Sequence, residues 1–296
     1  MPTQVGPFEL DEPLPEMSNA RLLMSLQPWI DIGSVGTLAL SFLEQAWDGQ
    51  PIGKLRRPGN FYDFSRYRPM LFRREGERHV VVPNTYLHHA RDPHGHDWLF
   101  LHALEPHNLG EDYVDGLYAV LTHLDVRDYT LVGSMYAPVP HTRPPVVSGG
   151  STSEALKDRL QRLGAKESNY EGPTTILATL PGMVQRENIP TATVILQLPA
   201  YAQVERDYRG LLRMLELLSG FYGWQLDLDA LRQEAERQRA AMDETAAENP
   251  QLQAMVQELE TVYDAQAEAG GAEDGADLSP QLETFLKDIE SRLSEN

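Results

Sequence analysis

Apolar runs alternate with amphipathic stretches over most of this chain, and the alternation predicts strands and helices in turn. Four apolar or β-branched runs predict core strands, at residues 22–26, 97–103, 129–135 and 191–198. Helical spacing of apolar positions follows them, in stretches that begin near Asp31 and Gly110 and over residues 151–163, 174–184 and 207–220. This order predicts an α/β fold with a mostly parallel sheet covered on both faces.

A segment between the first predicted helix and the next core strand has a different pattern. Residues 61–67, 69–73 and 79–83 predict short strands, and the turn at residues 75–77 predicts a hairpin between the last two. The aromatic side chains of residues 61–67 have two interpretations that the sequence leaves open. They pack a subunit interface, where aromatic residues are enriched, or they cover their own sheet. Trp29, Trp47 and Trp98 are expected in the core.

The pattern changes after residue 226. Residues 228–248 predict a charged helix, Asn249-Pro250 ends it, and apolar positions at helical spacing predict a second helix over residues 252–263. A flexible linker at residues 269–275 and a last helix over residues 282–293 follow. Each of the last two helices has one apolar stripe, which must pack on the core or on a neighbouring subunit. We therefore expect a core domain over residues 1–226, with a β insertion around 55–85. The helical region, residues 227–296, is expected to act as a lid or an interface arm.

Charge changes this picture of the helical region. The chain has a formal net charge of −19, and its last 68 residues hold 17 acidic and 5 basic side chains. Acidic proteins are repelled by nucleic-acid backbones, so we expect no nucleic-acid partner. The chain has no cysteine, no apolar run long enough to span a membrane and no signal-peptide pattern. A cytoplasmic location without a membrane partner is the expectation.

Candidate binding residues lie in the loops that follow the predicted strands, where open α/β sheets bind ligands. The loop that follows residues 129–135 is stiffened by four prolines and carries His141, Thr142 and Arg143. Arg143 suits a carboxylate or a phosphate, and His141 suits acid–base chemistry, oriented by Glu105 or Asp31. The alternative is that these side chains only brace the loop. The candidate ligand-binding residues are Asp31, Gly33, Ser34, Glu105, His141, Thr142, Arg143 and Tyr201.

Two other motifs point to a binding site, one for an anion and one for a metal, but each also has a structural explanation. Gly33-Ser34-Val35-Gly36 begins a predicted helix and offers backbone donors to an anion, but a tight turn explains the glycines equally well. Six of the nine histidines lie between His88 and His107. His94 and His96, with Asp92 or Asp97, have the side-chain types that ligate zinc. The segment at residues 86–97 is rich in turn residues, so a polar surface or interface loop is the preferred interpretation. We expect no metal and no cofactor.

Seven segments in order resemble the proteasome assembly chaperone 2 family, in its bacterial, actinobacterial-type branch. They span roughly residues 20–240, and the His-Thr-Arg-Pro run is the most specific of them. The segments are Pro28-Trp29-Ile30-Asp31-Ile32-Gly33-Ser34, Glu105-Pro106, Tyr136-Ala137-Pro138-Val139-Pro140-His141-Thr142-Arg143-Pro144, Leu180-Pro181-Gly182-Met183, Ile189-Pro190-Thr191-Ala192, Leu198-Pro199-Ala200-Tyr201 and Leu226-Asp227-Leu228-Asp229-Ala230-Leu231.

The resemblance implies a three-layer α/β core like that of purine nucleoside phosphorylases and some hydrolases, with a C-terminal helical appendage. It also implies a homo-oligomer, with a trimer favoured for this branch. Together with the lack of a complete catalytic motif, it favours a binding or scaffold protein without catalysis. The alternative is a phosphorylase- or hydrolase-like enzyme that acts on a small anionic ligand at the carboxyl ends of the strands.

Overall fold

Four parallel strands form the centre of the fold in the computed structural model, which describes residues 2–168 and 170–268. They lie side by side in the order β8 (Asp97–Leu104), β3 (Arg21–Gln27), β9 (Asp128–Ala137) and β12 (Thr191–Pro199). These are the four core strands that the apolar runs predict. Because they are parallel, their carboxyl ends meet at one edge of the sheet.

Six shorter strands extend this centre into a ten-stranded mixed sheet. Beyond β8 lie β7 (Tyr86–Arg91), β4 (Gln50–Leu55), β2 (Phe8–Leu10) and β1 (Thr3–Val5), each antiparallel to its neighbour. Beyond β12 lie β10 (Val147–Ser151), antiparallel to β12, and β11 (Ala165–Lys166). The α/β class with a mostly parallel central sheet is confirmed. The interpretation of residues 86–97 as a loop is wrong for its first half, which is strand β7.

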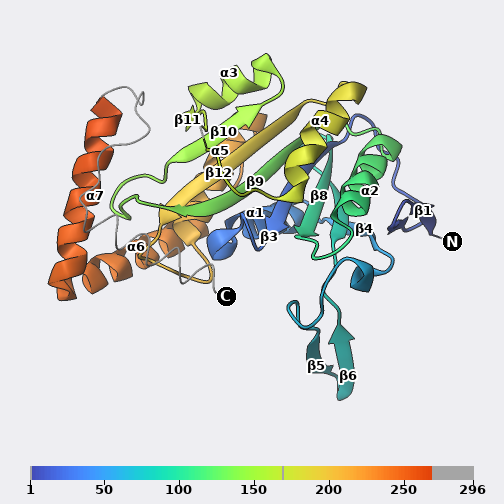
Figure 1. The fold of residues 1–296 in the computed structure, drawn as a ribbon, viewed down its shortest axis with the longest axis horizontal. Coiled ribbons are helices and arrows are strands. Elements are labelled where there is room, and N and C mark those ends of the chain that lie inside the picture. The colour runs from blue at the N-terminus through green and yellow to red at the C-terminus, as the bar shows by residue number, and fades with distance from the viewer. Residues whose placement is uncertain (1, 169, 269–296) are drawn as a thin grey trace.

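Helices cover both faces of the sheet and make three layers (Figure 1). One apolar cluster joins the sheet to α1 (Val35–Ala46), α3 (Glu154–Arg162) and α5 (Tyr208–Tyr222). The other joins it to α2 (Gly110–His123), to α4 (Leu180–Val184) and to the 3-10 turn η3 (Ile176–Thr179). Residues 174–184, predicted as one helix, are thus a 3-10 turn followed by a short α-helix. Three more 3-10 turns are η1 (Ile32–Ser34), η2 (Pro58–Asn60) and η4 (Gln185–Glu187).

Aromatic side chains form part of the apolar cluster that joins the sheet to α1, α3 and α5. Trp47, Trp98 and Trp224 pack edge-on or tilted, with ring centroids 4.7–6.1 Å apart. Burying such rings removes a large apolar area from water and contributes several kcal/mol, at roughly 25 cal/mol per Å². Trp47 and Trp98 are therefore core residues, as expected. Trp29 is not, because it is 54% exposed in the turn after β3.

The segment at residues 55–85 divides into a covered part and a projecting part. Residues 61–67 form turns, not the predicted strand, since the amides of Phe61 and Tyr62 both donate to the carbonyl of Pro58. Phe61 and Tyr62 are buried in the core cluster below α2. Of the two interpretations of these aromatic residues, the structure supports the second, in which they cover their own sheet.

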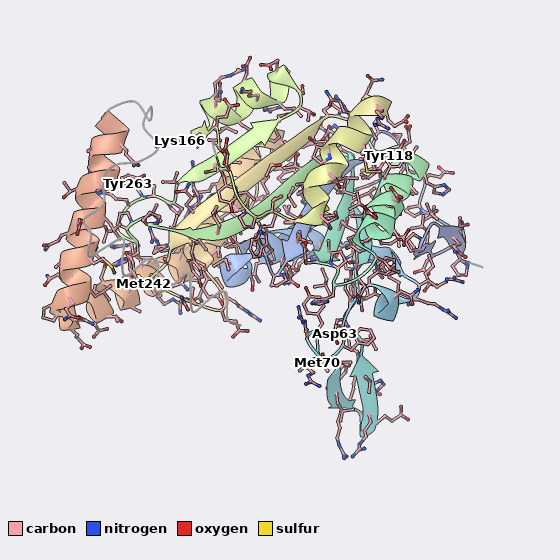
Figure 2. The ribbon with its side chains drawn as sticks, in the orientation of Figure 1. Asp63, Met70, Tyr118, Lys166, Met242 and Tyr263 are labelled. Atoms are coloured by element: carbon pink, nitrogen blue, oxygen red, sulfur yellow. The ribbon has the colours of Figure 1, made fainter. Side chains whose placement is uncertain are left out.

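The projecting part is a two-stranded hairpin of β5 (Met70–Arg74) and β6 (Glu77–Val81), joined by the predicted turn at Glu75-Gly76. It stands away from the rest of the molecule, as Figure 1 shows, and Figure 2 labels Met70 on it. Every residue of both strands is exposed. Met70 and Val80 are more than 60% exposed, although both are apolar.

Two helices end the described chain, α6 (Asp229–Glu248) and α7 (Pro250–Glu268), at the positions that the pattern predicts. Asn249 separates them, and its side-chain oxygen accepts hydrogen bonds from the amides of Gln251 and Leu252 at the start of α7. Helix α6 packs on α5, and α7 packs on α6. We call α6 and α7 together the arm. The predicted linker and last helix lie outside the described residues. None of the described helices has the length and apolarity that crossing a membrane requires.

Candidate functional site

The proline-rich loop after β9 lies at the carboxyl edge of the parallel strands. It is held next to the end of β12 by a hydrogen bond from the amide of Ala200 to the carbonyl of Ala137. Tyr201 lies two residues after the end of β12, so the parallel register of β9 and β12 brings Tyr201 to this loop. His141 is buried, while Thr142 and Arg143 are half-buried. The sheet therefore brings four of the predicted binding residues, residues 141–143 and Tyr201, to one place.

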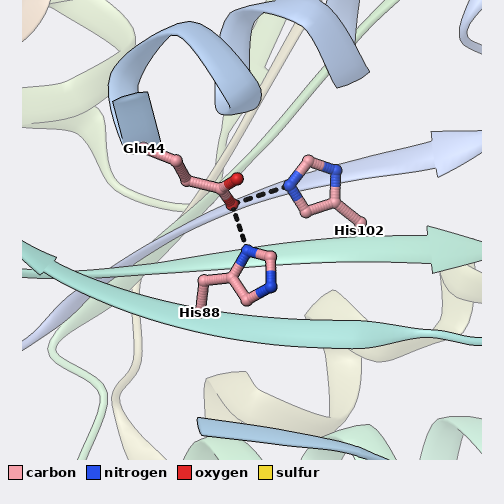
Figure 3. A group of neighbouring side chains, drawn as sticks. All are labelled: Glu44, His88 and His102. Carbon is pink, nitrogen blue, oxygen red and sulfur yellow. Dashed lines mark hydrogen bonds and ion pairs between the residues drawn. The ribbon is translucent and has the colours of Figure 1, made fainter. Parts of the chain in front are cut away.

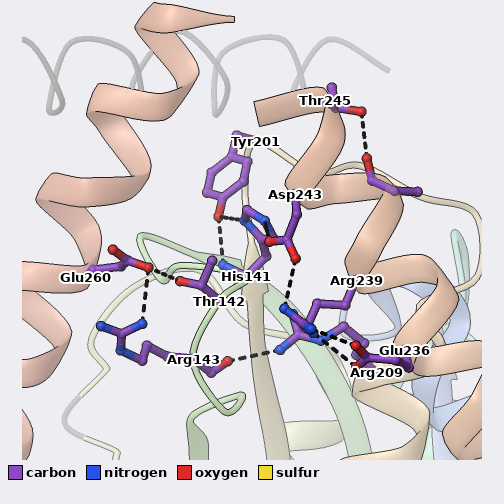
Figure 4. Close-up of polar contacts among 11 residues, drawn as sticks. His141, Thr142, Arg143, Tyr201, Arg209, Glu236, Arg239, Asp243, Thr245 and Glu260 are labelled. Carbon is purple, nitrogen blue, oxygen red and sulfur yellow. Dashed lines mark hydrogen bonds and ion pairs between the residues drawn. The ribbon is translucent and has the colours of Figure 1, made fainter. Parts of the chain in front are cut away.

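His141 has a partner on each side of its ring (Figure 4). Its Nδ1 lies 2.6 Å from the hydroxyl of Tyr201, which also accepts a hydrogen bond from the His141 amide at 2.7 Å. Its Nε2 lies 3.1 Å from Oδ1 of Asp243 on α6. A single assignment satisfies these contacts: Tyr201 donates to Nδ1, and Nε2–H donates to Asp243. Burial lowers the pKa of His141, although Asp243 opposes this, and burial raises the pKa of Tyr201 to about 12.

Arg143 is held by two carboxylates of α7. Its Nε and Nη2 donate to the two oxygens of Asp264 at 2.9 and 2.7 Å, a bidentate pair, and Nη1 donates to Glu260 at 3.1 Å. The Thr142 hydroxyl donates to the same oxygen of Glu260. These bonds raise the pKa of Arg143 and lower that of Asp264. The carboxylates occupy the position on Arg143 that a small anion would take.

A further contact fixes the arm to the core: Tyr263 on α7 donates to the carbonyl of Pro144 at 3.0 Å. Within the core, Arg209 on α5 donates to the carbonyl of Arg143 at 3.1 Å. Arg239 on α6 pairs with Asp243 at 2.8 Å and so holds the partner of His141. A cavity of about 640 Å³ lies between this part of α7 and the end of the sheet, and Lys166, Arg213 and Tyr263 line it. The arm of this chain thus docks on its own core.

The loop at residues 31–36 uses its donors within the chain. Oδ1 of Asp31 accepts hydrogen bonds from the amides of Gly36 and Thr37, at 2.6 and 3.2 Å, and so caps α1. Burial raises the pKa of this carboxyl group. The hydroxyl of Ser34 donates to the carbonyl of Glu205 at 3.0 Å. Gly33 has φ of 60° and packs against Asp207, which favours the tight-turn interpretation of the glycine.

Glu105 lies apart from the loop of His141. Strand β3 separates β8, which Glu105 follows, from β9, and the Glu105 side chain accepts a hydrogen bond from the amide of Ile176 on the other face of the sheet. Burial raises its pKa. The expectation that Glu105 or Asp31 orients His141 is therefore wrong. Asp31 turns inward to cap α1, and Tyr201 and Asp243 hold the His141 ring instead.

The contacts of the histidine-rich segment also differ from the zinc site that its sequence suggests. Asp92 accepts from the amides of His94 and His96 and from the indole of Trp98, so it stabilises a turn. Asp97 accepts from Arg91 and lies 2.8 Å from the His89 ring. Among the residues that the structure describes, the group that does converge is Glu44 with His88 and His102 (Figure 3). Sequence reasoning missed Glu44, because no local motif connects it to the histidines.

Most of this chain matches a known protein family. The sequence profile of the PAC2 family matches residues 25–246. The chain belongs to the PAC2 family. The matched range contains His141, Arg143 and Asp243, whereas Glu260 and Asp264 on α7 lie beyond it. None of the curated proteins matches the chain.

Solved structures similar to this PAC2 chain share its fold. A protein of unknown function from Corynebacterium glutamicum has a TM-score of 0.79 at 24% identity, over 88% of this chain and 98% of that one. A proteasome-assembly chaperone homologue of Mycobacterium tuberculosis has a TM-score of 0.70 at 26% identity, over 80% and 99%. An archaeal proteasome activator from Pyrococcus furiosus has a TM-score of 0.64 at 14% identity, over 80% and 97%.

Proposed function

We propose that this PAC2 protein is a homo-oligomeric binding or scaffold protein of the chaperone type, which acts without catalysis in the cytoplasm. The observation that carries the proposal is the β5–β6 hairpin, which presents apolar side chains to water on both of its faces. Large exposed apolar patches are uncommon on monomeric proteins and mark interaction sites. An isolated two-stranded hairpin is also only marginally stable in water, so a partner would stabilise it.

The partner that suits this hairpin is a second copy of the chain. Residues 66–81 contain five arginines and two glutamates, within a chain of net charge −19. Arg73 and Arg78 lie directly opposite each other in the ladder, next to the apolar pair Leu71 and Val80. This basic, apolar patch is complementary to an acidic protein surface, which every copy provides. A trimer is the assembly that the family resemblance favours.

Two of the similar solved structures support a role in the assembly of other proteins. One is named a proteasome-assembly chaperone homologue and another a proteasome activator. We propose for this chain a comparable role, in which the oligomer binds other proteins and holds them for assembly.

The loop of His141 supports a binding role over an enzymatic one. An enzyme acting on a small anion needs a free cation, whereas the Arg143 guanidinium is paired with Asp264 and Glu260. A general acid or base needs contact with substrate, whereas the His141 ring is buried between Tyr201 and Asp243. The proposal therefore assigns no reaction step to this loop. The loop instead anchors the arm, which presents an acidic surface.

The experiment is a mass measurement in solution. Sedimentation velocity of the wild type at micromolar concentration is expected to show an oligomer. The double variant Leu71→Glu/Val80→Glu is expected to shift it to the monomer, because it places two carboxylates in the apolar pair. Leu109→Glu is the control, since Leu109 is an exposed apolar residue outside the hairpin. A monodisperse wild-type monomer would contradict the proposal, and an oligomer unaffected by the double variant would exclude the hairpin as the interface.

A further inference from the structure

Three side chains with metal-binding chemistry converge from three separate elements of the core (Figure 3). Glu44 lies in the last turn of α1, His88 lies in β7, and His102 lies in β8. In the antiparallel ladder His88 is opposite Phe100, and His102 is two residues further along β8. Both histidines therefore project from the same face of the sheet, the face that α1 covers.

The geometry of the trio suits a metal ion. Oε1 of Glu44 lies 2.8 Å from Nδ1 of His88 and 2.7 Å from Nε2 of His102, and all three ligand atoms lie within 4.8 Å of one another. A metal with bonds of about 2.0–2.2 Å to nitrogen and oxygen needs ligand atoms roughly 3.0–3.5 Å apart. Displacing the ring protons and moving the side chains by a few tenths of an ångström would open that space.

The electrostatics of the trio also suit a cation. The Glu44 carboxylate faces both imidazole rings, so an anionic oxygen lies beside two nitrogen ligand atoms. All three side chains are half-buried, with 14–26% of each exposed, so they are partly shielded from solvent while remaining reachable by an ion.

A cavity beside the trio would leave coordination positions open. It has a volume of about 380 Å³, and its lining includes Glu44, His88 and His102 together with Ser41, Asn84 and Tyr86. Residues 81–83, at the base of the β5–β6 hairpin, form another part of the wall. Three protein ligands next to an accessible cavity are typical of metal sites that also bind water or a small ligand.

We propose that Glu44, His88 and His102 bind a divalent transition-metal ion, of which Zn²⁺ is the representative probe, with an open position facing this cavity. Two imidazoles and one carboxylate suit zinc and iron(II) better than calcium or magnesium, which prefer oxygen ligands alone. The trio is independent of the hairpin interface proposed above, since it needs no second copy of the chain.

The test uses the full chain without a polyhistidine tag, freed of metal with EDTA and dialysed. Isothermal titration with Zn²⁺ is expected to give about one ion per chain at a specific site. Glu44→Gln, which keeps the shape of the side chain, is expected to weaken Zn²⁺ binding more than tenfold. His88→Asn is the second variant and is expected to do the same. Co²⁺ bound in place of Zn²⁺ is expected to give visible absorption bands that both variants lose.

The double variant His94→Asn/His96→Asn is the matched control, because it removes two exposed histidines of the same segment. It is expected to bind Zn²⁺ as the wild type does. Thermal unfolding in EDTA checks that each variant is folded. Absence of Zn²⁺ binding in the folded wild type would overturn the proposal. So would binding that the control abolishes and Glu44→Gln leaves unchanged.

Discussion

Substitution of Gly33 tests how tightly the loop before α1 is packed. Its φ is +60°, and a Cβ there would lie 2.7 Å from Cβ of Asp207 and 3.3 Å from the Asp207 nitrogen. A side chain in this left-handed region costs about 1–2 kcal/mol. The overlap with Asp207 adds about 1–3 kcal/mol, as overpacking does elsewhere. Gly33→Ala is therefore expected to lower the free energy of unfolding by about 2–5 kcal/mol.

Asp207 explains why the overlap cannot be relieved cheaply. Its carboxylate accepts from the amide of Gly210 at 2.7 Å and caps α5, while its own amide donates to the carbonyl of Gly33 at 2.9 Å. Moving Asp207 away from a new methyl group would weaken both bonds. The destabilisation thus follows from backbone geometry and requires no bound ligand.

The assay is denaturant unfolding followed by tryptophan fluorescence, which the buried cluster of Trp47, Trp98 and Trp224 reports. Gly223→Ala is the matched control, because Gly223 has φ of +82° and a Cβ added there would meet no heavy atom within 4 Å. It is expected to lose only about 1–2 kcal/mol. Equal losses in the two variants, or no loss in Gly33→Ala, would refute the reasoning.

Two further substitutions address the loop that holds the arm. Arg143→Lys is expected to loosen the arm, because an ammonium group cannot form the parallel pair of bonds to Asp264, so limited proteolysis should cut α6–α7 faster. His141→Gln is expected to flatten the loss of thermal stability between about pH 7 and pH 5. Burial lowers the pKa of folded His141, so the unfolded wild type gains a proton below its ordinary pKa of 6.5 that the folded state resists.

Each of these variants has a matched control on the surface. Arg237→Lys alters an arginine whose ion pair, with Glu234, lies within α6, so the rate of cleavage should stay at the wild-type value. An Arg143→Lys protein that is cleaved no faster than the wild type would show that these ion pairs do not hold the arm. His123→Gln alters an exposed histidine at the end of α2. If His141→Gln and His123→Gln have the same profile of thermal stability against pH, burial of His141 does not cause the loss of stability at low pH.

The centre of the fold could be predicted because its strands are continuous apolar runs that need no information from elsewhere in the chain. The outer strands could not. Residues 50–55 contain Pro51 and Gly53, which disfavour a strand, and β4 forms because β2 and β7 pair with it on its two sides. Residues 86–91 precede the turn at Asp92-Pro93, and that turn chemistry obscured the strand before it.

The candidate site could be located from the sequence but not completed. The prolines and the strand before them indicate the loop of His141, and the parallel strands bring Tyr201 to it. The partners Asp243, Glu260 and Asp264 lie 102 to 121 residues later in the chain, and no spacing rule connects them to the loop. Glu44 is separated from its two histidines in the same way. Contacts of this kind depend on how helices dock, which local patterns do not encode.

The distance along the chain between Arg143 and its partners has a consequence for synthesis. Domains fold as units while the chain emerges from its amino-terminal end. The loop, β12 and α5 are therefore made well before Glu260 and Asp264, and the core can assemble while Arg143 still faces water. The arm can dock on this loop only after these two residues are made, so the ion pairs of Arg143 with Glu260 and Asp264 depend on synthesis of the chain through residue 264.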